Sequence, residues 1–231
     1  MAKAGTAKYS ISKSEYNKQP AYQSTLIFRT TSGFDKIFKI RDTLQSYMNM
    51  DLQPIYHEKY LHEGSTHYLE KLSFKEFGST KTVATSKRFA QDGSLRFEET
   101  LEASGLAFDM VGMFMFARTL DYSSLTPGTT FSVSSFIGKD VVKMKARYVG
   151  QMILEKSSNK KYKTLKFEMD IIDDAFATDK TALEVWISDD QNRIPIKLKA
   201  KLKIGAAEAE LDSYKGNKYP LSSLVVVNSK N

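Results

Sequence analysis

An alternation of apolar residues between positions 194 and 204 is the feature that most limits the fold. Successive side chains of a β-strand point to opposite faces, so this stretch predicts a strand with one buried and one solvated face. At about 3.3 Å per residue it would span roughly 36 Å. The expected buried residues are Ile194, Ile196, Leu198, Ala200, Leu202 and Ile204, and the other face carries Lys197, Lys199, Lys201 and Lys203.

A preceding strand at 183–189 and the loop sequence DQNR predict a hairpin with the lysine-rich strand. Burial of the apolar faces sets its register. The expected pairs are Ile187 with Ile196 and Val185 with Leu198 inside, and Trp186 with Lys197 and Glu184 with Lys199 outside. The apolar parity reverses after Gly205, which predicts a β-bulge there. A long strand bent by a bulge favours a barrel over a flat sandwich.

The rest of the chain supports a mainly β fold, which we expect to be a large antiparallel, distorted or open β-barrel. Further strands are expected at 21–31, 43–50, 54–62, 66–77, 80–90, 94–101, 130–137, 141–156 and 162–172. Residues 104–119 have a helical period and almost no charge, which predicts one main buried helix. A short helix is expected near 33–40, a flexible N-terminal lead-in at 1–20, and a single β-barrel-like domain at 21–231.

Composition excludes several kinds of site. The sequence has no cysteine, which rules out disulfides, thiol nucleophiles and zinc–thiolate sites. Its net charge of +7 allows an anionic partner but does not require one. No apolar run is as long as a membrane span, and the first residues lack the apolar core of a signal peptide. We therefore expect either a cytosolic protein or one whose signal has been removed.

Known catalytic and cofactor motifs are missing, and we expect no catalytic residue, metal or cofactor. The three histidines, His57, His62 and His67, are five residues apart. On a strand this spacing places His57 and His62 on opposite faces, so these two do not form a simple metal pair. We expect exposed hairpin histidines.

Two groups of residues are candidates for binding. The first is Arg41, Asp42, Asp109 and Arg118, which flank the two helical segments close to apolar residues. They form either internal ion pairs that fix helix to sheet or a polar ligand site at the barrel mouth. The second is an anion-facing surface made of Lys197, Lys199, Lys201, Lys203 and Trp186. The same lysines are equally accounted for as the solvated face of an amphipathic strand.

Three segments resemble a known family: IFKIRDTLQSYMNMDLQPIYHEKYLHEG, FDMVGMFMFARTLDYSSLTPGTTF and VWISDDQNRIPIKLKAKLKIGAAEAEL. Together they are similar to a domain-of-unknown-function family of exported Gram-negative proteins with a YmcC-like β-barrel fold. The resemblance implies a place in the periplasm or cell envelope and implies no catalytic residues.

These observations predict an uncharacterised, exported, non-enzymatic cell-envelope protein that binds a lipid, glycan or protein partner. A hydrolase acting on envelope polymers and a polyanion-binding module are the alternatives. We expect no nucleic-acid partner, because aromatic residues next to basic ones are too few. Peripheral contact with an anionic membrane surface stays open.

Overall fold

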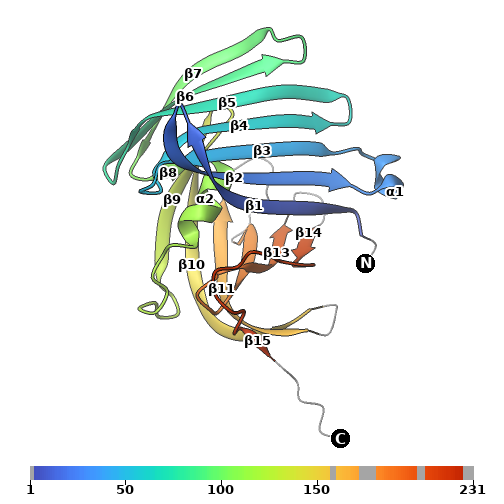
Figure 1. Cartoon of the computed structure of the whole chain (residues 1–231), viewed down its shortest axis with the longest axis vertical. Coiled ribbons are helices and arrows are strands. Elements are labelled where there is room, and N and C mark those ends of the chain that lie inside the picture. Colours follow the sequence, from blue (N-terminus) through green and yellow to red (C-terminus); the bar gives the residue numbers. More distant parts are fainter. Residues whose placement is uncertain (1–2, 157–159, 172–180, 202–205, 226–231) are drawn as a thin grey trace, which may run out of the picture. The chain divides into compact units, whose positions relative to one another are not determined.

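The computed structural model describes residues 3–156, 160–171, 181–201 and 206–225. Seven strands form sheet A, in which chain order equals spatial order and all neighbours are antiparallel (Figure 1). They are β1 (Gly5–Tyr16), β2 (Gln19–Thr30), β3 (Arg41–Met48), β4 (Pro54–Glu63), β5 (Thr66–Phe77), β6 (Lys81–Ala90) and β7 (Leu95–Ser104). Helix α1 (Ser32–Asp35) connects β2 to β3.

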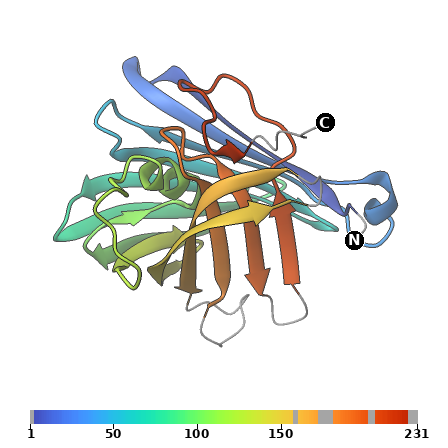
Figure 2. The same cartoon turned by 90° about the horizontal axis from the view of Figure 1, so that it is seen from below.

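The second sheet, sheet B, has the order β14-β13-β12-β11-β10-β9-β8. Its strands are β8 (Ala107–Phe108), β9 (Thr130–Ile137), β10 (Asp140–Glu155), β11 (Lys161–Ile171), β12 (Leu183–Ser188), β13 (Pro195–Lys201) and β14 (Ala206–Glu210), and β15 (Leu224–Val225) pairs with β11. Figure 2 shows the later strands, yellow to red, side by side. Helix α2 (Met110–Ala117) follows β8, which pairs with β9 in parallel.

The mainly antiparallel β architecture confirms the predicted fold class, and no closed barrel forms among the described residues. The chain divides into two compact units, where one domain was expected. Unit 1 comprises Met1–Ala117 and Val133–Val142, and unit 2 comprises Arg118–Ser132 and Lys143–Asn231. The predicted flexible lead-in is also replaced by structure, because β1 pairs along its whole length with β2.

Alternation along β3 defines the two faces of sheet A. Leu44, Ser46 and Met48 are buried on one side, which we call the inner face, while the residues between them are partly exposed on the outer face. Met48 packs with Phe108 and Met115, so α2 covers the inner face. A second apolar cluster of unit 1 joins Leu72, Ala84, Leu101 and Phe136. Unit 2 has its own core of Tyr122, Tyr148, Leu165, Phe167 and Ile187.

Both helices are shorter than predicted. The expected helix at 104–119 is α2, which occupies 110–117 only, because residues 107–108 form β8 and Asp109 caps the helix. The helix expected near 33–40 is the four-residue α1. The apolar spacing that suggested a longer helix does not reflect burial, since Ile37 is 78% and Phe38 50% exposed.

The β12–β13 hairpin has the predicted register at Glu184–Lys199, Val185–Leu198 and Trp186–Lys197. It then shifts, so that Ile187 pairs with Pro195 and not with Ile196.

Trp186 lies on the predicted face, opposite Lys197, but it is not solvated, because only 7% of the residue is exposed. Lys166, its neighbour on β11, lies 5.1 Å above the indole ring and also bonds Glu184 at 2.8 Å. The long lysine side chain thereby covers an aromatic residue on a face that pattern alone assigns to solvent.

The predicted bulge at Gly205 lies outside the described residues, as do Leu202, Lys203 and Ile204. On either side of these residues, β13 and β14 are antiparallel partners with Lys201 opposite Ala206. Strands β13 and β14 are therefore not parts of one continuous bent strand.

The position of Gly112 yields a test of α2 packing. A Cβ atom there would lie 2.7 Å from Asp109 Oδ2 and 2.8 Å from Met48 Cε. We expect Gly112→Ala to lower the free energy of unfolding by about 1–3 kcal/mol through overpacking. Gly33→Ala is the matched control, since nothing lies within 4 Å of its Cβ position. Urea denaturation of both variants measures the difference, and equal effects would contradict the packing described.

Candidate functional site

The structure separates the four charged residues that the sequence grouped. Arg41 pairs with Asp35, their Nη2 and Oδ2 atoms 2.5 Å apart. Asp42 accepts a hydrogen bond from the backbone N–H of His62 at 2.9 Å. Arg118 donates to the carbonyl of Asn192 at 2.8 and 3.1 Å. Each of these residues is engaged with a different partner, so they do not build a shared ligand site.

Asp109, the fourth member, is the most deeply placed of them, at 1% exposure. Its Oδ1 accepts the backbone N–H groups of Val111 at 2.9 Å and Gly112 at 2.8 Å, which makes it the N-cap of α2. Its Oδ2 accepts the hydroxyl of Ser46 on β3 at 2.7 Å. One carboxylate therefore joins the helix to the sheet.

His57 completes this interior cluster from β4. Its Nδ1 lies 3.1 Å from Asp109 Oδ1, but off the direction a hydrogen bond requires, so the contact is electrostatic. Burial by itself would raise the pKa of Asp109. The neighbouring His57 and the hydrogen bonds from Gly112 and Ser46 outweigh burial and hold that pKa below its usual value. The carboxylate therefore stays charged inside the protein.

The cluster has the residue types of a hydrolytic triad but not its order. A serine nucleophile needs a histidine within reach to take its proton, with the carboxylate behind the histidine. Here the carboxylate lies in the middle, and the Ser46 hydroxyl donates to Asp109. Ser46 is also fully buried. This arrangement stabilises structure and activates no nucleophile.

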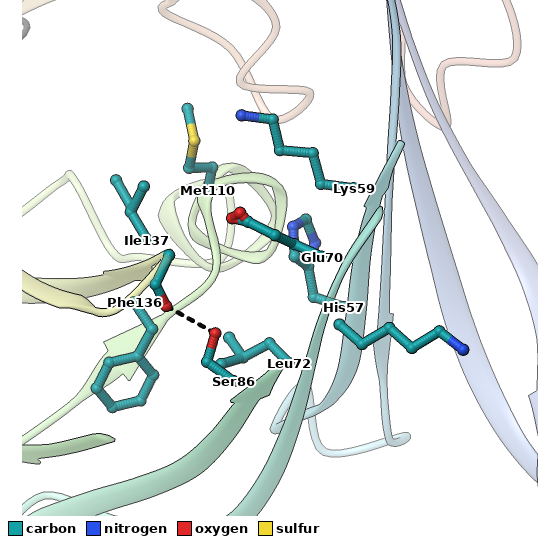
Figure 3. Close-up of a pocket in the computed structure, with 10 residues that line it drawn as sticks. His57, Lys59, Glu70, Leu72, Ser86, Met110, Phe136 and Ile137 are labelled. Atoms are coloured by element: carbon teal, nitrogen blue, oxygen red, sulfur yellow. Dashed lines mark hydrogen bonds between the residues drawn. The ribbon is translucent and has the colours of Figure 1, made fainter. Parts of the chain in front are cut away.

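A small cavity adjoins the cluster on the inner face. It has a volume of about 20 Å³ and is lined by His57, Lys59, Glu70, Ser86, Met110 and Phe136, among others (Figure 3). Ser86 donates to the carbonyl of Gly138 at 2.6 Å, and Glu70 pairs with Arg88 at 2.9 Å. A space of this size holds about one water molecule and no acyl chain.

The larger opening is a groove on the outer face of sheet A, over β4, β5 and β6. Its volume is about 420 Å³, within the range of ligand sites. It is lined by Tyr60, Leu61, His62, His67, Tyr68, Leu69, Lys71, Phe89, Ala90, Gln91 and Gly93. Tyr60 is 47% exposed, so a flat aromatic side chain is available to a ligand at this groove. We take this groove as the candidate functional site.

A cluster of tyrosines extends the aromatic surface beyond the groove along β4. The rings of Tyr16 and Tyr56 stack with centroids 5.3 Å apart, and Tyr47 lies 5.3 Å from Tyr16. Tyr56 donates its hydroxyl to Glu58 at 3.1 Å, and Tyr47 accepts a hydrogen bond from Gln23 at 2.9 Å. Tyr56 and Tyr60 are on one strand face and four residues apart, so the aromatic surface extends about 13 Å along β4.

Electrostatics keep these phenols neutral. Burial, followed by the nearby Glu58 carboxylate, raises the pKa of Tyr56 and of Tyr60. Burial likewise raises the pKa of Tyr68 to about 12. In the same groove, burial and then the adjacent His67 lower the pKa of His62. The wall of the groove thus offers the neutral hydroxyl of Tyr60 and the neutral imidazole of His62 at physiological pH.

The lysine face of β13 is largely neutralised by β14. Lys197 lies 3.0 Å from Glu208 and 3.4 Å from Glu210, and Lys199 lies 3.5 Å from Glu208. Lys201 is half-buried, and Lys203 lies outside the described residues. Since Trp186 is also buried, little of this expected anion-facing surface remains available as free positive charge.

Sequence reasoning missed the groove, although part of its signal was present. The sequence HEGSTH places a two-residue turn between the strands, which sets His62 opposite His67. Alternation along β4 also places Tyr56, Glu58 and Tyr60 on the face opposite His57, and the expected separation of His57 from His62 is confirmed. The pattern does not reveal that Phe89 of β6 joins them, because that depends on the pairing of β5 with β6.

Within the described ranges, no three histidine, aspartate or glutamate side chains gather in a way that would hold a metal ion. No helix there combines the length and apolar character needed to cross a bilayer.

A family model described as a protein of unknown function, DUF3108, matches residues 1–212. The chain belongs to the DUF3108 family. Among solved structures, it is similar to a β-barrel-like protein of domain of unknown function DUF1849 from Brucella abortus, with 13% identity and a TM-score of 0.53 over 91% of this chain and 88% of that one. Among proteins with curated descriptions, none matches the sequence.

For this DUF3108 protein, the likeness confirms an unknown-function family with a β-barrel-like fold. The more specific YmcC-like assignment is not supported by it.

The depressed pKa of Asp109 predicts a pH dependence of stability. The folded pKa lies below the value of about 3.9 in an unfolded chain. The stabilisation is therefore complete above that value and is lost as the pH falls from about 4 through the folded pKa. We expect Asp109→Asn to cost about 1–3 kcal/mol at pH 7 and to flatten the loss of stability below pH 4. Urea titrations between pH 7 and 2.5 measure this.

The exposed Asp51 provides the control, because it lies at the surface in the turn before β4. Asp51→Asn should reproduce the wild-type profile. An Asp109→Asn profile parallel to that of the wild type would show that Asp109 carries no such charge in the folded protein.

Proposed function

We propose that this DUF3108 protein is a non-enzymatic protein of the cell envelope that binds a glycan chain along the outer face of sheet A. The observation that carries the proposal is the groove of about 420 Å³ with Tyr60, Phe89 and two histidines in its wall. Sugars present flat C–H faces surrounded by hydroxyls. Aromatic rings next to phenol, imidazole and ammonium groups match both parts of such a ligand.

The chemistry of the outer face favours a glycan over a lipid. Four of its aromatic residues are tyrosines, each of which combines an apolar ring with a neutral hydroxyl. Gln23 and Glu58 supply further polar groups beside the rings. The inner cavity, at about 20 Å³, leaves no room for an acyl chain. The aromatic surface of about 13 Å along β4 suits a chain of several sugars.

The two alternative functions have weaker support. A hydrolase acting on glycans normally uses a pair of carboxyl groups flanking the scissile bond. No aspartate or glutamate is among the residues that line the groove. Polyanion binding through the β13 face is disfavoured because its first two lysines are already paired with glutamates.

Location in the cell envelope is the second part of the proposal, and it rests on the resemblance of the three sequence segments to exported proteins. Fractionation of the native host with an antibody against the chain tests it. We expect the protein in the periplasmic or membrane fraction, and recovery with the cytosolic markers would contradict this part alone.

Glycan binding is tested by calorimetric titration with oligosaccharides from envelope polysaccharides, from monosaccharide to hexasaccharide. We expect affinity to rise with chain length up to about four sugars. Tyr60→Ala and Phe89→Ala should each weaken binding about three- to tenfold, since one aromatic contact contributes roughly 0.5–1.5 kcal/mol.

Tyr214→Ala is the matched control, because Tyr214 is 42% exposed and lies in unit 2. It should bind as the wild type does. If the protein binds lipid vesicles but no oligosaccharide, its ligand is a lipid and the glycan proposal is wrong. If Tyr60→Ala and Phe89→Ala both bind glycan as the wild type does, the groove is not the binding site.

A further inference from the structure

We propose that His62 and His67 form a binding site for a divalent transition-metal ion, with copper(II) the most tightly bound. The two imidazoles are directly opposite each other on β4 and β5, and their ring centroids lie 3.8 Å apart. Imidazole nitrogen is a preferred ligand of copper, nickel and zinc. The inference is independent of glycan binding, because the ion alone is the ligand.

The hairpin register explains why the two rings meet. Gly64 and Ser65 form a two-residue turn, and Glu63 pairs with Thr66 next to it. Along an antiparallel pair, hydrogen-bonded and non-hydrogen-bonded positions alternate, and side chains are closer at the latter. The backbone N–H of His62 bonds to Asp42, away from β5, as expected at a non-hydrogen-bonded position. The backbone thus brings the two imidazoles together without any metal.

The surroundings leave the pair accessible. Both side chains are half-buried and line the groove on the outer face. No cluster of three such ligands exists in the described part of the chain, so the ion would keep open positions for water or for a ligand in the groove. Only rotation of the side chains is needed for a ring nitrogen of each to approach one ion. Such a two-ligand site is expected to follow the order copper above nickel and zinc.

The composition makes this site easy to test. The sequence has three histidines and no cysteine, and the third histidine, His57, is buried beside Asp109. Copper(II) bound by imidazole nitrogen in the folded protein is therefore assigned to His62 and His67 with little background.

The experiment is a calorimetric titration of the full chain with copper(II), together with electron paramagnetic resonance of the loaded protein. We expect one ion per chain and nitrogen hyperfine structure from two imidazoles. His62→Gln and His67→Gln should each weaken binding at least tenfold and remove one nitrogen from the spectrum. Ser65→Ala, in the same turn, is the control and should leave both readouts unchanged.

Circular dichroism and thermal unfolding establish that the variants keep the fold. A variant that carries both His62→Gln and His67→Gln and still binds copper(II) as tightly as the wild type would overturn the proposal. A spectrum of the wild-type protein without imidazole nitrogen would overturn it as well. Loss of glycan binding by Tyr60→Ala with copper binding intact would separate this site from the proposed function.

Discussion

A single buried carboxylate organises unit 1. Asp109 accepts two backbone N–H groups at the start of α2 and the hydroxyl of Ser46 on β3, beside the imidazole of His57. A carboxylate without these partners would be strongly disfavoured in the interior. The close approach of helix to sheet also requires Gly112, where no side chain fits. Helix α2 thereby covers the inner face of β2 and β3, and the small cavity beside the cluster holds about one water molecule.

The outer face of sheet A carries the groove taken as the candidate functional site. The same strands serve both purposes, because alternate residues of β4 point to opposite sides: His57 inward, Tyr56, Glu58 and Tyr60 outward. Serine, histidine and aspartate are all present, yet they brace the core in an order that activates no nucleophile. The groove gathers aromatic rings, imidazoles and one lysine without a carboxylate.

Much of the fold was predictable from period-two alternation. Apart from β8, which lies where a helix was expected, the strands from β2 to β12 lie close to their expected ranges, and three pairs of the β12–β13 hairpin have the expected register. The failures share one cause, which is that a pattern along one strand does not identify the neighbour. Trp186 is buried because Lys166 of β11 covers it, and Lys197 is neutralised because β14 folds back beside it. The four charged residues grouped from the sequence fail as one site for the same reason, because Asp42 bonds His62 of β4 and Arg118 bonds Asn192, far along the chain.

The sequence by itself determined which residues face which side of most strands and where several of the turns lie, such as the one between β4 and β5, since side-chain alternation and turn chemistry are local properties. It also determined that no thiol chemistry takes place, because cysteine is absent. Only the tertiary structure decided that Asp109 is a structural anchor, that Phe89 joins Tyr60 in one groove, and that the β13 lysines are paired. These outcomes depend on distances between strands far apart in the chain, and such distances are set by sheet pairing and by packing of α2.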